Sequence, residues 1–216
     1  YKRQTETAAV TSLEKCDHVL DGTPEQTRLL ISAGQPNLMT QLKIVRTDGT
    51  ECAPEEAGEL LIHNPDLVMQ GYWRNAEATA EAMRDGWFRT GDVGTLNECG
   101  YLTILDRIKD MIISGGENIY SREVEEALIS HVAVENAAVI GVPSDKWGEA
   151  VLAFVVASDN LNVGGTELIE YCRTRIASYK KPSRIEFVNA LPYLASGKVD
   201  KVKLREPYWI GRKRRV

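Results

Sequence analysis

The residues with the clearest chemistry are an aspartate, an arginine and two lysines in turn-forming or linker sequence. Asp92 follows Thr-Gly, and a carboxylate exposed by a glycine turn can accept hydrogen bonds from both hydroxyls of a ribose. Arg107 can add a ribose or phosphate contact through its rigid fork of donors. Lys198 follows Ser-Gly, where a mobile ammonium can approach negative charge on a carboxylate or phosphoryl group. The set predicts a nucleotide site divided between two bodies joined near Lys109, because boundary linkers absorb domain rotations.

Each of these residues also has a purely structural interpretation. Asp92 can close a turn through its own backbone, and the charged run Asp106–Asp110 can be a solvated linker. The segment Ser114–Asn118 lacks the GxxxxGK[ST] pattern of a phosphate-binding loop. Its two glycines would instead let a ligand chain pass close to backbone amides. Lys198 alone is one surface lysine among many, so both interpretations stay open for each residue taken singly.

The elements that must position these residues fall into two groups. Residues 1–108 predict a β-rich unit with short strands and tight turns, forming a small barrel or sheet. Its expected strands are Gln41–Val45, Gly58–Ile62, Trp87–Arg89 and Tyr101–Leu105, and its expected helix is Asn75–Met83. The tripeptide that carries Asp92 would therefore lie at the end of the third strand.

Residues 109–216 predict a compact α+β unit in the order β-α-β-β-α-β. Ser121 is expected to N-cap a helix that runs to His131, and Thr166 to cap a second helix. The remaining expected elements are the strands Met111–Ile113, Ala137–Val142, Ala150–Ala157 and Arg184–Val188 and the helix Val199–Glu206. The predicted fold class is α/β (α+β), with a small β-barrel-like unit followed by a compact α+β unit.

Composition and charge indicate a soluble globular protein, since 43% of the 216 residues are hydrophobic and 26% are charged. A net charge of −5 argues against non-specific nucleic-acid binding, and the basic end Arg212–Arg215 is interpreted as a solvated tail. Four scattered cysteines predict free thiols in a reducing cytoplasm. No apolar run approaches the length of a transmembrane segment. The chain opens on Tyr1 in sequence typical of the middle of a protein, and we expect a fragment.

Taken together and in order, short motifs over essentially the whole chain resemble the adenylate-forming acyl-CoA synthetases, and fatty-acid–CoA ligases most closely. Each motif is weak alone, whereas the ordered set is specific and favours the chemical interpretation of each residue. The matching segments are Gln4–Thr7, Gly71–Trp73, Asp85–Phe88, Thr90–Asp92, Asp106–Asp110, Ser114–Tyr120, Trp147–Glu149 and Leu191–Pro192 leading to Gly197–Lys198.

The resemblance implies a role for each candidate residue. Asp92 and Arg107 would be the ribose-binding pair, and Lys109 would be the hinge between a large AMP-binding domain (ending at residue 108) and a small mobile domain (109–216). Lys198 would be the catalytic lysine that contacts the carboxylate and the α-phosphate. Such an enzyme joins a fatty acid to CoA in two steps, through an acyl-adenylate and then a thioester.

The resemblance also implies ligands for ATP, Mg²⁺ and CoA. Thr5 and Glu6 match the family's phosphate and magnesium ligands, respectively. Gly115 and Gly116 match the loop that lines the CoA pantetheine tunnel after the small domain has turned.

Two departures from the family pattern bear on activity. Lys2 and Arg3 stand where the family motif has tyrosine and glycine, so either a bulky Arg3 blocks the adenine pocket or the first three residues are a non-native junction. The family's Ser/Thr/Gly-rich phosphate loop and its acyl-binding region are absent from this sequence. We therefore expect the isolated chain to be inactive in adenylation and to need the N-terminal domain of its own protein.

Several alternatives remain open at this stage. The acid could be aromatic, as in aryl-acid–CoA ligases, or the enzyme could be luciferase-like. The chain could also act alone as a non-catalytic binding or assembly module, and a homo-oligomer is compatible with the sequence. Acyl-chain length is not encoded in this part of the protein.

Overall fold

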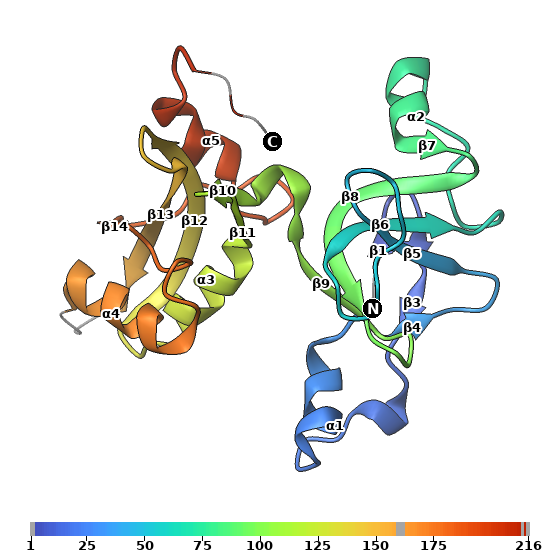
Figure 1. Cartoon of the computed structure of the whole chain (residues 1–216), viewed down its shortest axis with the longest axis horizontal. Coiled ribbons are helices and arrows are strands. Elements are labelled where there is room, and N and C mark those ends of the chain that lie inside the picture. Colours follow the sequence, from blue (N-terminus) through green and yellow to red (C-terminus); the bar gives the residue numbers. More distant parts are fainter. Residues whose placement is uncertain (1–2, 159–162, 213, 215–216) are drawn as a thin grey trace. The chain divides into compact units, whose positions relative to one another are not determined.

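The computed structural model describes residues 3–158, 163–212 and 214 (Figure 1). The chain divides into two compact units, Tyr1–Ile108 and Lys109–Val216. In the part of the chain that the structure describes, no helix is both long enough and apolar enough to cross a membrane.

The first unit is built on a curled antiparallel sheet (Figure 1). Its strands are β5 (Gln41–Val45), β6 (Gly58–His63), β7 (Met83–Arg84), β8 (Trp87–Leu96) and β9 (Leu102–Arg107). They follow the order β5-β6-β8, and β8 pairs with both β7 and β9. Smaller elements surround the sheet: β1 (Arg3–Gln4), β2 (Ala8–Ala9), β3 (Thr11–Ser12), β4 (Gln35–Pro36), α1 (Pro24–Arg28), α2 (Ala76–Ala82) and the 3-10 turns η1 (Lys15–Asp17) and η2 (Leu29–Ile31).

The core of this unit follows from alternation along the strands, because successive side chains of a strand point to opposite faces. Leu60 and Ile62 of β6 are fully buried and pack with Val10, Ile44 and Leu102. Glu59 and Leu61 lie on the other face of the same strand. The buried face fixes the register of β6 and thereby of β8, which carries Asp92.

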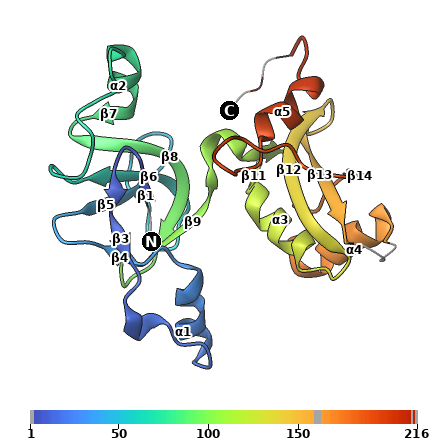
Figure 2. The same cartoon turned by 180° about the vertical axis from the view of Figure 1, so that it is seen from behind.

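The second unit contains a five-stranded sheet of mixed direction. Its elements are η3 (Ile108–Asp110, shared with the first unit), β10 (Ile112–Ser114), β11 (Glu117–Ile119), α3 (Ser121–Ile129), β12 (Val134–Ser144), β13 (Gly148–Ala157), α4 (Gly165–Arg175), β14 (Arg184–Phe187), α5 (Lys201–Arg205) and η4 (Glu206–Tyr208). The sheet order is β11-β10-β13-β12, and β14 pairs in parallel with β13. The long hairpin β12–β13 is the centre of the unit, visible from both sides (Figures 1 and 2).

Both faces of this hairpin are buried. Val139 and Ala153 belong to a core that includes side chains of α3 and α4, such as Leu128 and Leu168. Ile140 and Leu152 face the opposite side, where α5 and η4 cover them through side chains such as Leu204 and Tyr208. A strand buried on both faces reads as a continuous apolar run, which is the pattern of both strands here.

The expected fold class is confirmed, with three local corrections. Ser121 does not cap α3, because Tyr120 is the N-cap and the buried Ser121 hydroxyl accepts a hydrogen bond from Lys201 Nζ at 2.6 Å. Thr166 lies inside α4, whose N-cap is Gly164. The last helix is shorter than expected, because the Asp200 side chain accepts from the Lys203 amide and starts α5 at Lys201.

Candidate functional site

Asp92 lies on a bulge inside β8, not at the end of a strand as the sequence predicted. Glu59 pairs with Val93 and Leu61 with Arg89, so three residues of β8, Thr90–Asp92, stand opposite Leu60 alone. Gly91 has φ +67°, a conformation that favours glycine. Bulges of this kind change the direction in which a side chain points. The bulge is therefore the device that positions the Asp92 carboxylate.

Thr90 holds the bulge in place. Its hydroxyl donates to the Leu60 carbonyl at 2.8 Å and accepts from the Asp92 amide at 3.0 Å. The turn-closing hydrogen bond that the alternative interpretation gave to Asp92 is thus made by Thr90. The Asp92 side chain is available for contacts with other side chains.

Asp92 is 3% exposed and contacts Arg107 and Gln4. Arg107 is its register partner across β8 and β9, and Arg107 Nε lies 3.5 Å from Asp92 Oδ1. Gln4 Nε2 donates to Asp92 Oδ2 at 3.0 Å. The structure therefore brings the predicted ribose pair together, with the aspartate buried and the arginine side chain 44% exposed.

Gln4 was not among the predicted site residues. Its Oε1 is buried and has no hydrogen-bond partner in the described part of the chain. A buried amide oxygen without a partner costs free energy, so it is a place where a ligand donor would be stabilising. The one feature of the sequence that could have pointed to Gln4 is its position directly before Thr5 and Glu6.

Thr5 and Glu6 form the tight turn between β1 and β2. Thr5 is exposed, and Glu6 Oε1 accepts a hydrogen bond from the Tyr72 hydroxyl at 3.1 Å. Burial, and then the Glu6 carboxylate, raise the pKa of Tyr72. Both residues thus lie next to Gln4 in the same unit as Asp92. Nothing is described for Lys2 or for the Arg3 side chain, so their predicted effect on an adenine pocket lies outside the described residues.

Glu6 could hold a magnesium ion only together with the phosphates of a bound nucleotide. Mg²⁺ in such sites takes one or two protein carboxylates and completes its octahedron with substrate phosphates and water. Among the residues described here, no group of three or more His, Cys, Asp or Glu side chains could hold a metal by itself. A single half-buried carboxylate matches the first arrangement.

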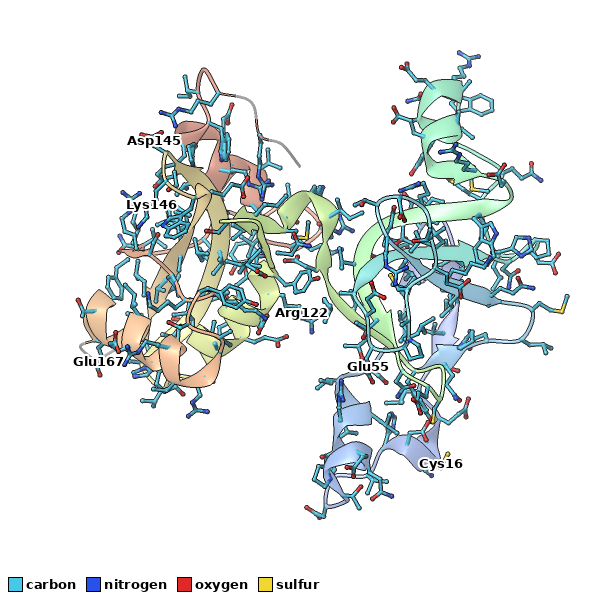
Figure 3. The ribbon with its side chains drawn as sticks, in the orientation of Figure 1. Cys16, Glu55, Arg122, Asp145, Lys146 and Glu167 are labelled. Atoms are coloured by element: carbon cyan, nitrogen blue, oxygen red, sulfur yellow. The ribbon has the colours of Figure 1, made fainter. Side chains whose placement is uncertain are left out.

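Gly115 and Gly116 form the two-residue turn between β10 and β11. Both have positive φ, +62° and +90°, as hairpin turns of this length require. The Gly115 amide donates to the Trp147 carbonyl at 2.8 Å, and a Cβ on Gly115 would lie 3.0 Å from the Trp147 ring. The Nζ of Lys146, a residue labelled in Figure 3, lies 4.5 Å from the centre of the Trp147 ring. The turn presents backbone beside a half-exposed indole.

Lys198 and Lys109 are both exposed. Lys198 closes a tight loop in which its carbonyl accepts from the Leu194 amide at 2.8 Å, and Gly197 has φ +78°. Lys109 lies in η3, at the sequence boundary between the two units. The structure leaves both ammonium groups in solvent.

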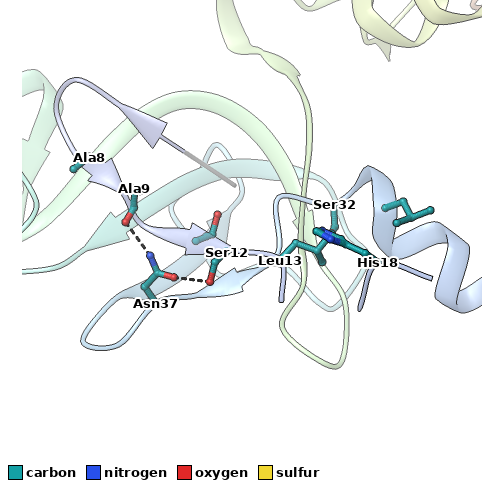
Figure 4. A pocket seen from close by; sticks show the side chains of 9 residues that line it. Ala8, Ala9, Ser12, Leu13, His18, Ser32 and Asn37 are labelled. Carbon is teal, nitrogen blue, oxygen red and sulfur yellow. Dashed lines mark hydrogen bonds between the residues drawn. The ribbon is translucent and has the colours of Figure 1, made fainter. Parts of the chain in front are cut away.

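The first unit also contains a pocket of ≈ 800 Å³ beside β2 and β3 (Figure 4). Asn37 spans one side of it by donating to the Ala9 carbonyl and accepting from the Ser12 hydroxyl, at 2.9 and 2.8 Å. His18 is its one titratable side chain. None of the predicted ATP or CoA residues lines this pocket.

One surface interpretation is wrong. Arg214 does not belong to a solvated basic tail, because its side chain is 12% exposed and pairs with Glu149 at 2.7 Å. Arg212 is exposed and lies 3.4 Å from Asp145, as a solvated residue would. Lys213 and Arg215 lie outside the described residues.

Comparison with known proteins identifies the second unit. Residues 123–198 match the AMP-binding enzyme C-terminal domain. A feruloyl-CoA synthase from Amycolatopsis sp. is 48% identical over 177 residues, which are 82% of this chain and 36% of that protein. The long-chain-fatty-acid–CoA ligase FadD13 of Mycobacterium tuberculosis is 45% identical over 82% of this chain and 35% of its own length.

A solved structure extends the match to the fold. The o-succinylbenzoate CoA synthetase MenE of Bacillus subtilis, in complex with the acyl-adenylate intermediate OSB-AMP, matches with a TM-score of 0.77 and 42% identity, over 81% of this chain and 35% of that one. The chain thus spans little more than a third of the length of these relatives. Residues 123–198 are therefore an AMP-binding enzyme C-terminal domain, and the chain as a whole matches the C-terminal portion of acyl- and aryl-CoA ligases.

Proposed function

We propose that this chain supplies the ribose-binding strand and the mobile unit of an AMP-forming acid–thiol ligase. The observation that carries the proposal is the buried Asp92 carboxylate on its bulge, with Arg107 opposite it and Gln4 beside it. A carboxylate held in this way is suited to accept the two hydroxyls of a ribose. In this proposal residues 1–108 end the large domain, and residues 109–216 are the small mobile domain.

The first half-reaction forms an acyl-adenylate. A carboxylate oxygen of the acid bonds to the α-phosphorus of ATP, the bond from that phosphorus to the bridging oxygen breaks, and pyrophosphate leaves with the electron pair. Negative charge grows on the phosphoryl oxygens, and the exposed ammonium of Lys198 would neutralise it. Thr5 would hold phosphate. Glu6 would hold Mg²⁺, which when bound also offsets phosphate charge.

The second half-reaction forms the thioester. The sulfur of CoA bonds to the acyl carbon, the bond from that carbon to the AMP oxygen breaks, and the thiol proton passes to solvent. Lys198 has no role in this step. Rotation at Lys109 would exchange it for Gly115 and Gly116, whose turn presents bare backbone to the pantetheine chain.

We infer a fatty acid as the substrate, with an aryl acid as the alternative. One relative acts on long-chain fatty acids, another is a feruloyl-CoA synthase, and their identities to this chain are similar. The four free cysteines support a reducing compartment such as the cytoplasm. The test is ATP–pyrophosphate exchange by the full-length protein, with the chain continued upstream, across a panel of fatty and aromatic acids. The absence of exchange with every acid of the panel would favour the non-catalytic module.

The division of labour has its own test. Lys198→Ala should abolish acid-dependent exchange but largely spare thioester formation from supplied acyl-adenylate. Lys203→Ala is the matched control, because Lys203 is also exposed and lies five residues further along the chain. Equal loss of both half-reactions in the Lys198 variant would refute the proposal that Gly115 and Gly116 replace Lys198 between the two steps.

A further inference from the structure

The end of the chain contacts the start of the second unit. Arg214 donates through Nη2 to the Met111 carbonyl at 2.5 Å and through Nη1 to the Lys109 carbonyl. Its Nε and Nη2 also donate to the two oxygens of Glu149, at 2.7 and 3.1 Å. One guanidinium therefore links the carbonyls of Lys109 and Met111 to the Glu149 carboxylate of β13, a task for which its planar fork is suited.

Glu149 is placed for this contact. Its side chain is 7% exposed, and its Oε2 also accepts from the Ile113 amide at 3.3 Å. Room for the carboxylate comes from Gly141, where a Cβ would lie 2.2 Å from Glu149 Oε2. A buried carboxylate needs a cation and donors around it, and Arg214 and Ile113 supply both.

A second ion pair fastens the same segment. Arg205 of α5 donates to Asp110 Oδ1 at 2.9 Å, and both side chains are nearly buried, at 11% and 15% exposed. The residues after Lys198 thus contact this segment at the Lys109 and Met111 carbonyls and at the Asp110 side chain. Trp209 makes a further contact with β12. Its indole donates to the Gly141 carbonyl at 3.0 Å and keeps the end of the chain beside Glu149.

We propose that Arg214 is a positioning residue that fixes the Lys109–Asp110 peptide to the second unit and excludes the backbone torsions after that peptide from rotation between the units. A carbonyl oxygen moves with the planar peptide that joins its residue to the next one. Rotation about any bond after that peptide would break the contact of Arg214 with the Lys109 carbonyl. Rotation about φ and ψ of Lys109 would leave it intact. The proposal rests on the proposed hinge at Lys109 and names the residue, Arg214, that holds the backbone on one side of that hinge.

The contact can be tested on this 216-residue chain by hydrogen exchange of backbone amides. Arg214→Gln should accelerate exchange of the Ile113 amide by roughly ten- to a hundredfold, the effect of losing a hydrogen bond that involves a charged group. Arg212→Gln, the matched control at an exposed arginine, should change it less than twofold. Arg214→Lys should fall between the two, because an ammonium keeps the charge but has three donors on one atom, too few for the four hydrogen bonds that Arg214 makes.

The reference amides are those of the β12–β13 ladder, such as Ile140. Unchanged exchange at Ile113 in Arg214→Gln would overturn the proposal. Equal acceleration at Ile113 and Ile140 would also overturn it, because Arg214 would then support the whole unit and not the segment. This readout does not depend on the ligase assignment.

Activity gives the functional half of the test. In the full-length ligase, Arg214→Gln should lower kcat of the complete reaction about tenfold and change KM for ATP less than twofold, because the ribose pair lies in the first unit. Arg214→Lys should recover part of the rate. An unchanged kcat would show that confining the rotation has no role in turnover. If the wild-type protein has no ligase activity, the proposed function fails while hydrogen exchange still decides the contact.

Discussion

Replacing Asp92 with asparagine tests the ribose assignment most directly. Asparagine keeps the size of the side chain and one carbonyl oxygen, but it replaces the second acceptor with an amide NH2 group that only donates. A carboxylate that binds two ribose hydroxyls therefore loses at least one of them. The bulge itself should persist, because Thr90 and Leu60 hold it without the Asp92 side chain.

The magnitudes follow from the contacts. A hydrogen bond to a charged group contributes about 1.5–3 kcal/mol, so the loss of one hydroxyl contact should weaken ATP binding roughly ten- to a hundredfold. Stability should fall less. The hydrogen bond from Gln4 becomes a neutral one, and the contact with the 44% exposed Arg107 is screened by solvent. We expect a loss of about 1–2 kcal/mol in the first unit.

The assay is titration calorimetry of the full-length protein with ATP and with 2′,3′-dideoxy-ATP. The wild type should prefer ATP, whereas in Asp92→Asn this preference should shrink roughly ten- to a hundredfold, because the dideoxy sugar has no hydroxyl contacts to lose. Asp66→Asn, at an exposed aspartate of the same unit, is the matched control.

The reasoning fails if Asp92→Asn weakens both nucleotides by the same factor. That result would mean that Asp92 supports the shape of the sheet or the position of Arg107, and that another group binds the ribose. Hydrogen exchange along β8 distinguishes a folded variant from a damaged one.

Three further outcomes follow from the structure. Lys109→Pro should freeze one orientation of the units and impair one half-reaction selectively, measured by exchange and by thioester formation from supplied acyl-adenylate; survival of both would show that Lys109 is not the hinge. Burial raises the pKa of the Cys172 thiol from 9.0 to about 11, so an aromatic disulfide reagent at pH 8 should leave it unmodified in the folded chain. Because the unfolded thiol ionises first, the stability of the second unit should fall as pH rises from about 9 to about 11, and Cys172→Ala should lack this dependence. Gly141→Ala should lower the unfolding free energy of that unit by about 3 kcal/mol, because its Cβ would displace the Glu149 carboxylate; Gly164→Ala, with open space around the new methyl group, should change urea unfolding little.

Periodicity and turn residues predicted most elements correctly. The alternating segment Gln41–Val45 and the helix after Asn75 have the bounds expected for them within one residue. The apolar runs of the β12–β13 hairpin were recognised as strands, although their ends extend further than the runs because polar residues at the tip also pair. These features depend on local pattern, which a single sequence contains.

The features that were missed depend on partners distant in the chain. The bulge at Asp92 exists because β8 has three residues where β6 has one, and no local pattern shows that count. Ser121 looked like a helix cap, but its hydroxyl is taken by Lys201, 80 residues later. Arg214 looked like part of a solvated tail because its partner Glu149 is buried 65 residues earlier. In each case the sequence shows which polar or charged side chain is present, but its role depends on a partner that only the folded chain brings close.

Rotation of one unit against the other requires that neither depends on the other for its core. The buried hydrophobic clusters of the described residues satisfy this, because each cluster lies wholly within one unit. A change of orientation would therefore expose no side chain of these clusters. That segment is exposed at Lys109 and clamped by two arginines immediately after it. A rotation between two defined orientations needs free backbone torsions at one residue, next to a segment that is held in place. A longer flexible linker would permit many orientations and favour none.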